Sequence, residues 1–181
     1  MRLRHANSIR TATASVEFAV VLSTVLVPLM LGTWEVGRLV QVQQILDEAT
    51  REGARIAAQG RIINLKGTYT EVVVSDTDPN NPDVVSAVKN HLNAAGISTT
   101  GLSVTFNFLD SSGNTVASPT MPYQGTKGQP FRVTASLPYT SFRWTTTNMF
   151  NITQAKSTID WVSMIDDPFT VNTTLPSWTG Y

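Results

Sequence analysis

The chain has no cysteine, few histidines and no net charge, and each of these facts argues against a class of function. Without cysteine among its 181 residues, it has no disulfide, zinc–thiolate site or thiol nucleophile. It has two histidines: His5 is close to the N-terminus, and His91 has no second histidine on its side of the apolar run described below. Metal and acid–base chemistry therefore start from a small inventory. We expect no metal ion and no cofactor.

Familiar catalytic and nucleic-acid-binding patterns are also missing. No G-x-S-x-G, P-loop, G-x-G-x-x-G or H-E-x-x-H motif occurs. Asp160, Asp166 and Asp167 lie near the end of an expected strand, and we interpret them as solvent-facing rather than as paired catalytic acids. Lysine plus arginine and aspartate plus glutamate number 13 each, and this balance argues against nucleic-acid binding. The sequence favours a protein that is not an enzyme.

The segment Asp76–Asp83, DTDPNNPD, begins with a spacing typical of calcium loops. An EF-hand loop needs glycine where Asn81 stands and glutamate where Ala87 stands. We interpret this segment as a solvated loop, and whether it binds calcium stays open.

What the chain does have is a long uncharged run from Phe18 to Trp34. As a helix this run covers roughly 25 Å, and counting residues 18–36 as the span brings it closer to the ~30 Å hydrocarbon core of a bilayer. In lipid the backbone must satisfy its own hydrogen bonds, which requires a helix, and Pro28 is tolerated in such a span. We predict one membrane-spanning helix.

The residues before the span are basic and include no acid: Arg2, Arg4, His5 and Arg10. The positive-inside rule therefore places residues 1–12 in the cytoplasm and the remainder across the membrane. The competing interpretation is a cleaved signal peptide, whose apolar region is about 7–15 residues long and ends in a small-x-small site. The run here is longer, and its exit at Trp34-Glu35 fits such a site poorly. A retained anchor is favoured.

The helical pattern continues after the span as far as Gln59. Apolar or small residues recur at spacings of three and four: Leu39, Val42, Leu46, Ala49, Gly53 and Ile56. Polar residues between them form a water-facing surface, and Gly60 is a C-terminal stop. Residues 13–60 are therefore predicted to form one uninterrupted helix about 68 Å long, with its first half in lipid and its second half in water.

Residues 61–165 are richer in threonine, serine, asparagine, proline and glycine and have shorter periods. A helix is expected over Asp83–Ala95, with one apolar face made of Val85, Val88, Leu92 and Ala95. Strands are expected at Thr70–Ser75, Ser103–Leu109, Thr115–Ala117, Phe131–Leu137 and Thr158–Ile165. A long helix followed by an antiparallel meander predicts the α+β class.

One face of the sheet is expected to pack on the Leu39–Ile56 stripe, where Ala49 and Gly53 allow close approach. The tail, residues 166–181, contains two prolines and is expected to be partly ordered at best.

Three motifs in the N-terminal helix carry a family resemblance. They are Val16-Glu17-Phe18-Ala19, Trp34-Glu35-Val36-Gly37-Arg38 and Gly53-Ala54-Arg55. In this order and spacing, residues 13–58 closely resemble the TadE-like proteins of tight-adherence (Flp-type) pili. The matching positions are Val16, Glu17, Phe18, Glu35, Gly37, Arg38, Gly53 and Arg55; Val36 replaces the aromatic residue usual at its position.

The resemblance implies a pilin-like fold and a structural role as a minor pseudopilin, anchored in the bacterial inner membrane with its α+β domain in the periplasm. Implied partners are the lipid bilayer, other pilins or pseudopilins, the pilus assembly platform and a prepilin peptidase. The alternative function is a single-pass, membrane-tethered periplasmic binding or enzymatic domain unrelated to pili, with the helix as a simple leash.

The resemblance also suggests a processing site. Pseudopilin leaders are cut before a segment with glutamate at its fifth position, so Glu17, followed by Phe18, places the cut between Ala12 and Thr13. The family usually has glycine where Ala12 stands, and processing therefore stays open. After a cut, the amine of Thr13 could pair with Glu17 of a neighbouring subunit. Otherwise Glu17 simply marks the helix start in the headgroup layer.

Small residues along the helix, namely Gly32, Gly37, Ala49 and Gly53, would favour side-by-side packing with neighbouring helices.

Overall fold

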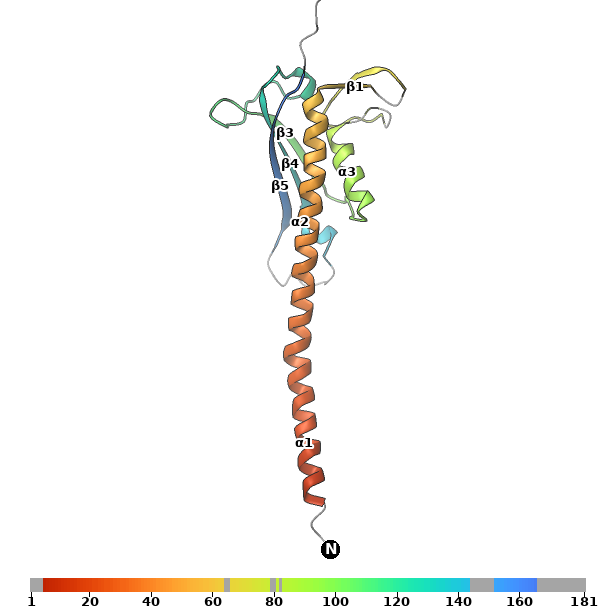
Figure 1. Cartoon of the computed structure of the whole chain (residues 1–181), viewed down its shortest axis with the longest axis vertical. Coiled ribbons are helices and arrows are strands. Elements are labelled where there is room, and N and C mark those ends of the chain that lie inside the picture. Colours follow the sequence, from red (N-terminus) through yellow and green to blue (C-terminus); the bar gives the residue numbers. More distant parts are fainter. Residues whose placement is uncertain (1–4, 64–65, 79–80, 82, 144–151, 166–181) are drawn as a thin grey trace, which may run out of the picture.

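A computed structural model shows a long helical rod with an α+β domain packed around its C-terminal half (Figure 1). It describes residues 5–63, 66–78, 81, 83–143 and 152–165, with side chains from residue 13 onward. The expected tail, residues 166–181, lies outside the described residues. The predicted α+β class, with one long N-terminal helix and antiparallel strands, is confirmed.

The rod consists of α1 (His5–Val21), a π-helical turn (Leu22–Leu26) and α2 (Val27–Gln59). The helix is continuous as predicted, but it begins before residue 13 and includes one widened turn. Pro28 explains the position of that turn: its ring has no N–H and would clash with the carbonyl of Thr24 in a regular α-helix. Gly60 ends the rod as predicted, with φ of 63° and its N–H donating to the Ala57 carbonyl at 3.2 Å.

The main sheet is antiparallel and has the order β3 (Ser103–Phe108), β4 (Pro130–Pro138), β5 (Gln154–Val162), so the meander is confirmed. A separate hairpin pairs β1 (Arg61–Ile63) with β2 (Tyr69–Glu71). The predicted alternation holds: Phe106, Phe108, Phe131, Val133, Ala135 and Leu137 are buried. The last strand begins earlier than expected and ends at Val162. Residues 115–117 form a single bridge from Thr115 to Leu109 rather than a strand.

The strand expected at Thr70–Ser75 ends at Glu71, because the residues that follow form hydrogen bonds with the start of α3 (Val84–Ala94) and not with another strand. The carbonyls of Val73 and Val74 accept hydrogen bonds from the N–H groups of Val84 and Val85 at 3.3 and 3.0 Å. These amides open the helix and have no partner within it. Asp83 caps the same end by accepting a hydrogen bond from the Ser86 N–H.

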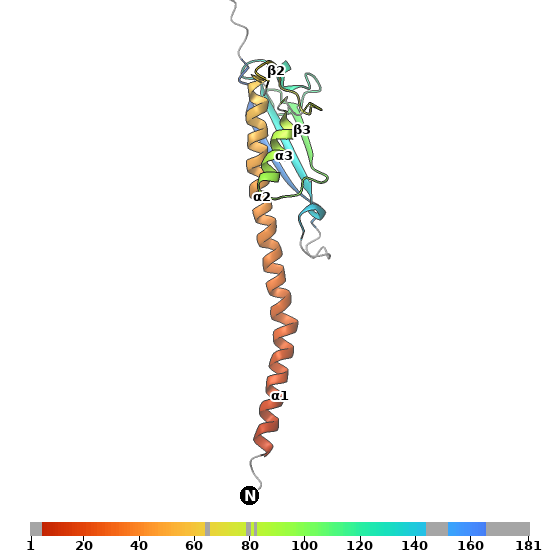
Figure 2. The same cartoon turned by 90° about the vertical axis from the view of Figure 1, so that its right-hand side faces the viewer.

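The buried face of α3 is Val84, Val88 and Leu92, and Ala95, expected on that face, is exposed. Helices α2 and α3 run side by side in Figures 1 and 2, and α2 also packs along β5. The lower core cluster joins Val42, Leu46 and Ala49 of α2 to both α3 and the sheet. The upper cluster contains Phe106, Phe108 and Phe131, whose ring centroids lie 4.9–6.4 Å apart.

The prediction that Gly53 lets the sheet approach the helix is wrong about the partner, which is α3. A Cβ at Gly53 would lie 2.8 Å from Val88 Cγ2 and 3.4 Å from Val84 Cγ1. Gly53 therefore sets the closest approach of the two helices.

We predict that Gly53→Leu lowers the free energy of unfolding by about 1–3 kcal/mol, because the added side chain has no space against Val88. A Cβ at Gly37, on the same helix, meets nothing within 4 Å. Gly37→Ala should therefore raise the same free energy by about 0.5–1 kcal/mol. Denaturant unfolding of the full chain in detergent, followed by circular dichroism, measures both. Equal stability of the two variants would contradict the assigned packing.

Candidate membrane and assembly surface

The part of the rod below the domain exposes apolar side chains in every direction. Thr13–Gln59 is long and apolar enough to cross a membrane, and the most apolar stretch within it is 0% buried. Val16, Phe18, Leu29 and Met30 are each more than 60% exposed. In water such a surface would be unfavourable, at roughly 25 cal/mol per Å² of apolar area. This surface is consistent with a single membrane anchor.

The hydroxyl groups of Ser23, Thr24 and Thr33 within this surface are satisfied by the helix itself. Thr24 Oγ1 donates to the Val20 carbonyl at 2.7 Å, and Thr33 Oγ1 donates to the Leu29 carbonyl at 2.8 Å. Ser23 Oγ donates to the Val20 carbonyl at 3.0 Å. Because each hydroxyl returns to a carbonyl three or four residues earlier, it presents no unmet donor to lipid.

The domain closes on the rod at Glu35, directly above the exposed surface. Glu35 is only 2% exposed, and its Oε1 accepts a hydrogen bond from the hydroxyl of Tyr139, which is also 2% exposed. Its Oε2 is buried and has no hydrogen-bond partner among the described residues. Tyr139 begins a 3₁₀ turn (Tyr139–Ser141) after β4, and its ring packs edge-on against Phe142 at 5.2 Å. This pair ties the base of the domain to the helix.

The surroundings of Tyr139 favour the neutral, donating phenol. Burial and the hydrogen bond to Glu35 together raise the pKa of Tyr139 to about 12. Both causes act against a phenolate, which would be poorly solvated and would repel the carboxylate. The tyrosine therefore keeps its proton, and its role as donor, throughout the physiological pH range.

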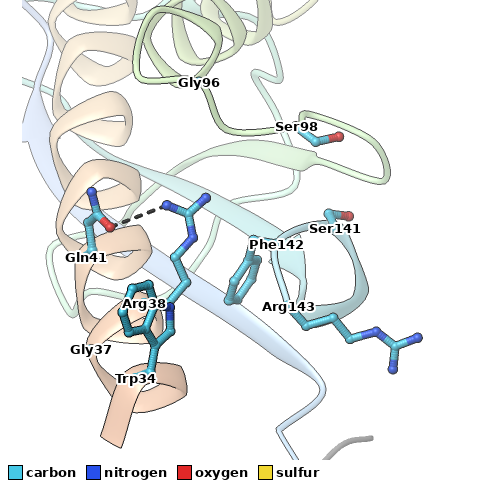
Figure 3. A pocket seen from close by; sticks show the side chains of 9 residues that line it. All are labelled: Trp34, Gly37, Arg38, Gln41, Gly96, Ser98, Ser141, Phe142 and Arg143. Atoms are coloured by element: carbon cyan, nitrogen blue, oxygen red, sulfur yellow. Dashed lines mark hydrogen bonds between the residues drawn. The ribbon is translucent and has the colours of Figure 1, made fainter. Parts of the chain in front are cut away.

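A cleft of about 820 Å³ opens beside this contact, between α2, the loop after α3 and the 3₁₀ turn (Figure 3). Its lining residues are Trp34, Gly37, Arg38, Gln41, Gly96, Ser98, Ser141, Phe142 and Arg143. In Figure 3 the Arg38 side chain runs up along α2, and its Nη1 donates to Gln41 Oε1 at 3.3 Å. Arg143 extends from the opposite wall, away from α2. Among the described residues, the lining contains two cations and no acid.

The structure separates the residues that the sequence grouped for assembly. Thr13, Val16, Glu17 and Phe18 are exposed on α1, whose helical backbone also includes Ala12. Gly37 is exposed and Gly32 is partly exposed.

Ala49 and Gly53 are buried inside the domain, so the hypothesis that they pack against a neighbouring subunit is corrected. The motif residue Arg55 is on the solvent side of α2, in an ion pair of 2.6 Å with Glu52.

Two candidate acid groups have structural partners. Asp160 pairs with Arg132 of the neighbouring strand at 2.6 Å, which lowers the pKa of the Asp160 carboxyl. In the loop at 76–83, Asp76 accepts hydrogen bonds from the Asp78 N–H and the Asn81 amide. Among the described residues, no cluster of three His, Cys, Asp or Glu could hold a metal ion. Asp166 and Asp167 lie outside those residues.

Sequence reasoning missed the turn after β4. The sequence identifies Glu35 only as a family-motif position and as the charge that ends the apolar run, and no pattern in it indicates burial against Tyr139. The available signal was weak: a tyrosine directly after an alternating strand that ends in proline. The pairing joins positions 104 residues apart, which local patterns do not reveal.

We predict that Tyr139 ionises about two pH units above an ordinary tyrosine, near pH 12. Ultraviolet titration of the wild type minus Tyr139→Phe isolates its phenolate signal, and Glu35→Gln should lower this midpoint only in part, because burial, the larger cause of the raised pKa, remains. Because the folded pKa is raised, the stability contributed by Tyr139 is complete below pH 10 and falls between pH 10 and 12. An unchanged midpoint in Glu35→Gln would contradict the contact.

Comparison with known proteins gives one family. No match was found among curated proteins or among solved structures. Residues 12–55, about a quarter of the chain, match the family model for TadE-like proteins. The match includes the exposed apolar surface, Glu35 and the part of α2 that lines the cleft, Trp34 to Gln41. The resemblance predicted from the three motifs is thereby confirmed, and the N-terminal helix of this chain is a TadE-like segment.

Proposed function

We propose that the protein is a minor pseudopilin, a structural component in the assembly of a tight-adherence pilus. TadE-like proteins are a family of structural pilus components that is not known to be enzymatic. The observation that carries the proposal is the rod: one helix that is apolar and exposed at its start and forms the central element of a folded domain at its end.

The proposed anchor is the exposed apolar part of the rod, in the bacterial inner membrane. Thr13 to Trp34 covers roughly 32 Å as a helix, which matches the ~30 Å hydrocarbon core. In this proposal the span ends at Trp34, just before Glu35, because Glu35 is already enclosed by the domain. The basic residues at 1–12 place the N-terminus in the cytoplasm and the domain of residues 61–165, with the tail of residues 166–181, in the periplasm.

The rod gives the proposal a physical mechanism. Because the helix joins span to domain without a loop, a force or displacement on the span is transmitted to the domain. Neighbouring pilins or pseudopilins would pack along the exposed helix, where Gly32 and Gly37, which have no side chain, would let another helix approach closely. The alternative, a tethered binding or enzymatic domain, requires only a flexible membrane tether. Such a tether does not need a buried contact like that of Glu35 with Tyr139 at the membrane boundary.

Glu17 is the proposed assembly residue. It is exposed within an apolar surface, where a carboxylate is costly unless it has a partner. After a cut between Ala12 and Thr13 by a prepilin peptidase, the new amine at Thr13 would supply a positive charge for Glu17 of a neighbouring subunit. The assembly platform would bring the two chains together.

We expect Glu17→Ala to abolish or strongly reduce piliation in a strain that carries the chain with its pilus system, because the neighbour's amine loses its partner. Glu48→Ala, on the solvent face of α2, removes the same charge and should leave piliation unchanged. Piliation is scored by electron microscopy, and the mass of each membrane-extracted protein is measured.

A mass lacking residues 1–12 supports processing, and an intact Met1 contradicts it. Normal piliation in Glu17→Ala would contradict the assembly role.

A further inference from the structure

We propose that the cleft between α2 and the Tyr139–Ser141 turn binds the phosphate headgroup of an anionic phospholipid of the outer leaflet, with the lipid's acyl chain lying along α2 below it. The inference goes beyond the pilus role and rests on the anchor that is part of that proposed function.

The chemistry of the cleft selects an anion. Arg38 and Arg143 both line it, although the Arg143 side chain extends away from α2, and none of the described lining residues is acidic. Glu35 is nearby, but it is buried against Tyr139 and does not line the cleft. Gln41 adds a side-chain amide on the same wall as Arg38. Guanidinium groups form charge-assisted hydrogen bonds with phosphate oxygens, and a volume of about 820 Å³ is within the range of small-molecule sites.

The helix below the cleft supplies an apolar track in register with it. Residues three, four and seven positions before Trp34 share its face of the helix, and they are Leu31, Met30 and Val27. These side chains are 42%, 62% and 48% exposed. Gly37, Arg38 and Gln41 lie three, four and seven positions after Trp34 and line the cleft. One helix face therefore changes from apolar to cationic at Trp34, as a lipid changes from acyl chain to phosphate.

Trp34 fixes the depth of this change. It is 64% exposed at the end of the apolar surface, and tryptophan is enriched at the level of lipid headgroups. In Figure 3 it lies at the lower end of the cleft, with Arg38 above it on the same helix. The two arginines are on the side of the span opposite the basic N-terminus, so the positive-inside rule does not account for them. Their position at the end of the apolar surface suits recognition of an anionic headgroup.

Native mass spectrometry of the full-length chain in detergent, with phosphatidylglycerol or phosphatidylcholine added, tests the proposal. We expect tighter binding of phosphatidylglycerol. Arg38→Gln should weaken it about fivefold, the contribution typical of one basic residue at an anionic surface, and Arg143→Gln should weaken it by less, because this side chain extends away from α2. Arg51→Gln removes the same charge higher on α2 and should leave it unchanged. Circular dichroism verifies that each variant is folded.

Three results would overturn the inference: equal binding of the two lipids, unchanged binding in the Arg38→Gln/Arg143→Gln double variant, or equally tight binding of soluble glycerol phosphate, which would make the cleft a site for free phosphates. None of these affects the anchor, which fails separately if the full chain stays monomeric and soluble after detergent is removed.

Discussion

The hydrogen bond between Glu35 and Tyr139 is the contact on which the architecture depends, because it fixes where the helix leaves the domain. Below it, the side chains of the rod are exposed and apolar; above it, the same helix is the central element of a packed core. A buried carboxylate is costly without a partner. Glu35 can therefore be buried only if Tyr139 is held where it can donate its hydrogen bond. Phe142 and the end of β4 hold it.

From this contact the rest of the domain follows the helix upward. Small residues on α2 determine which elements pack closely against it. Gly53 allows the close approach of α3, and the alanines at 54, 57 and 58 allow the upper core cluster to pack on the helix. At the far end the Met164 N–H donates to the Ala58 carbonyl at 2.7 Å, and the Val72 N–H donates to the Gly60 carbonyl at 2.8 Å. The domain therefore contacts the rod along its C-terminal half, from Glu35 to Gly60, and not only at its end.

Local patterns in the sequence predicted the helix, its stop at Gly60, the three strands of the meander and the α+β class, because each depends on neighbours within a few residues. They failed where distant segments compete. Val73 and Val74 look like strand residues, but their carbonyls serve the start of α3. The spacing of Gly53 on the helix suggests a surface for another subunit, but α3 covers it. The burial of Glu35 and the cleft beside it could not be predicted for the same reason, since Tyr139, Phe142 and Arg143 come from the segment after β4, far from α2 in the sequence.

The central claim is that span and domain share one unbroken helix through Glu35, and a distance across that point tests it directly. Because the chain has no cysteine, spin labels can be attached at Ser15→Cys and Gln44→Cys without removing native thiols. Double electron–electron resonance on the full chain in lipid nanodiscs should give a narrow distribution near 44 Å, the length of a continuous helix at about 1.5 Å per residue. A broad distribution centred at clearly shorter distances would mean a hinge near Trp34 and would contradict the account.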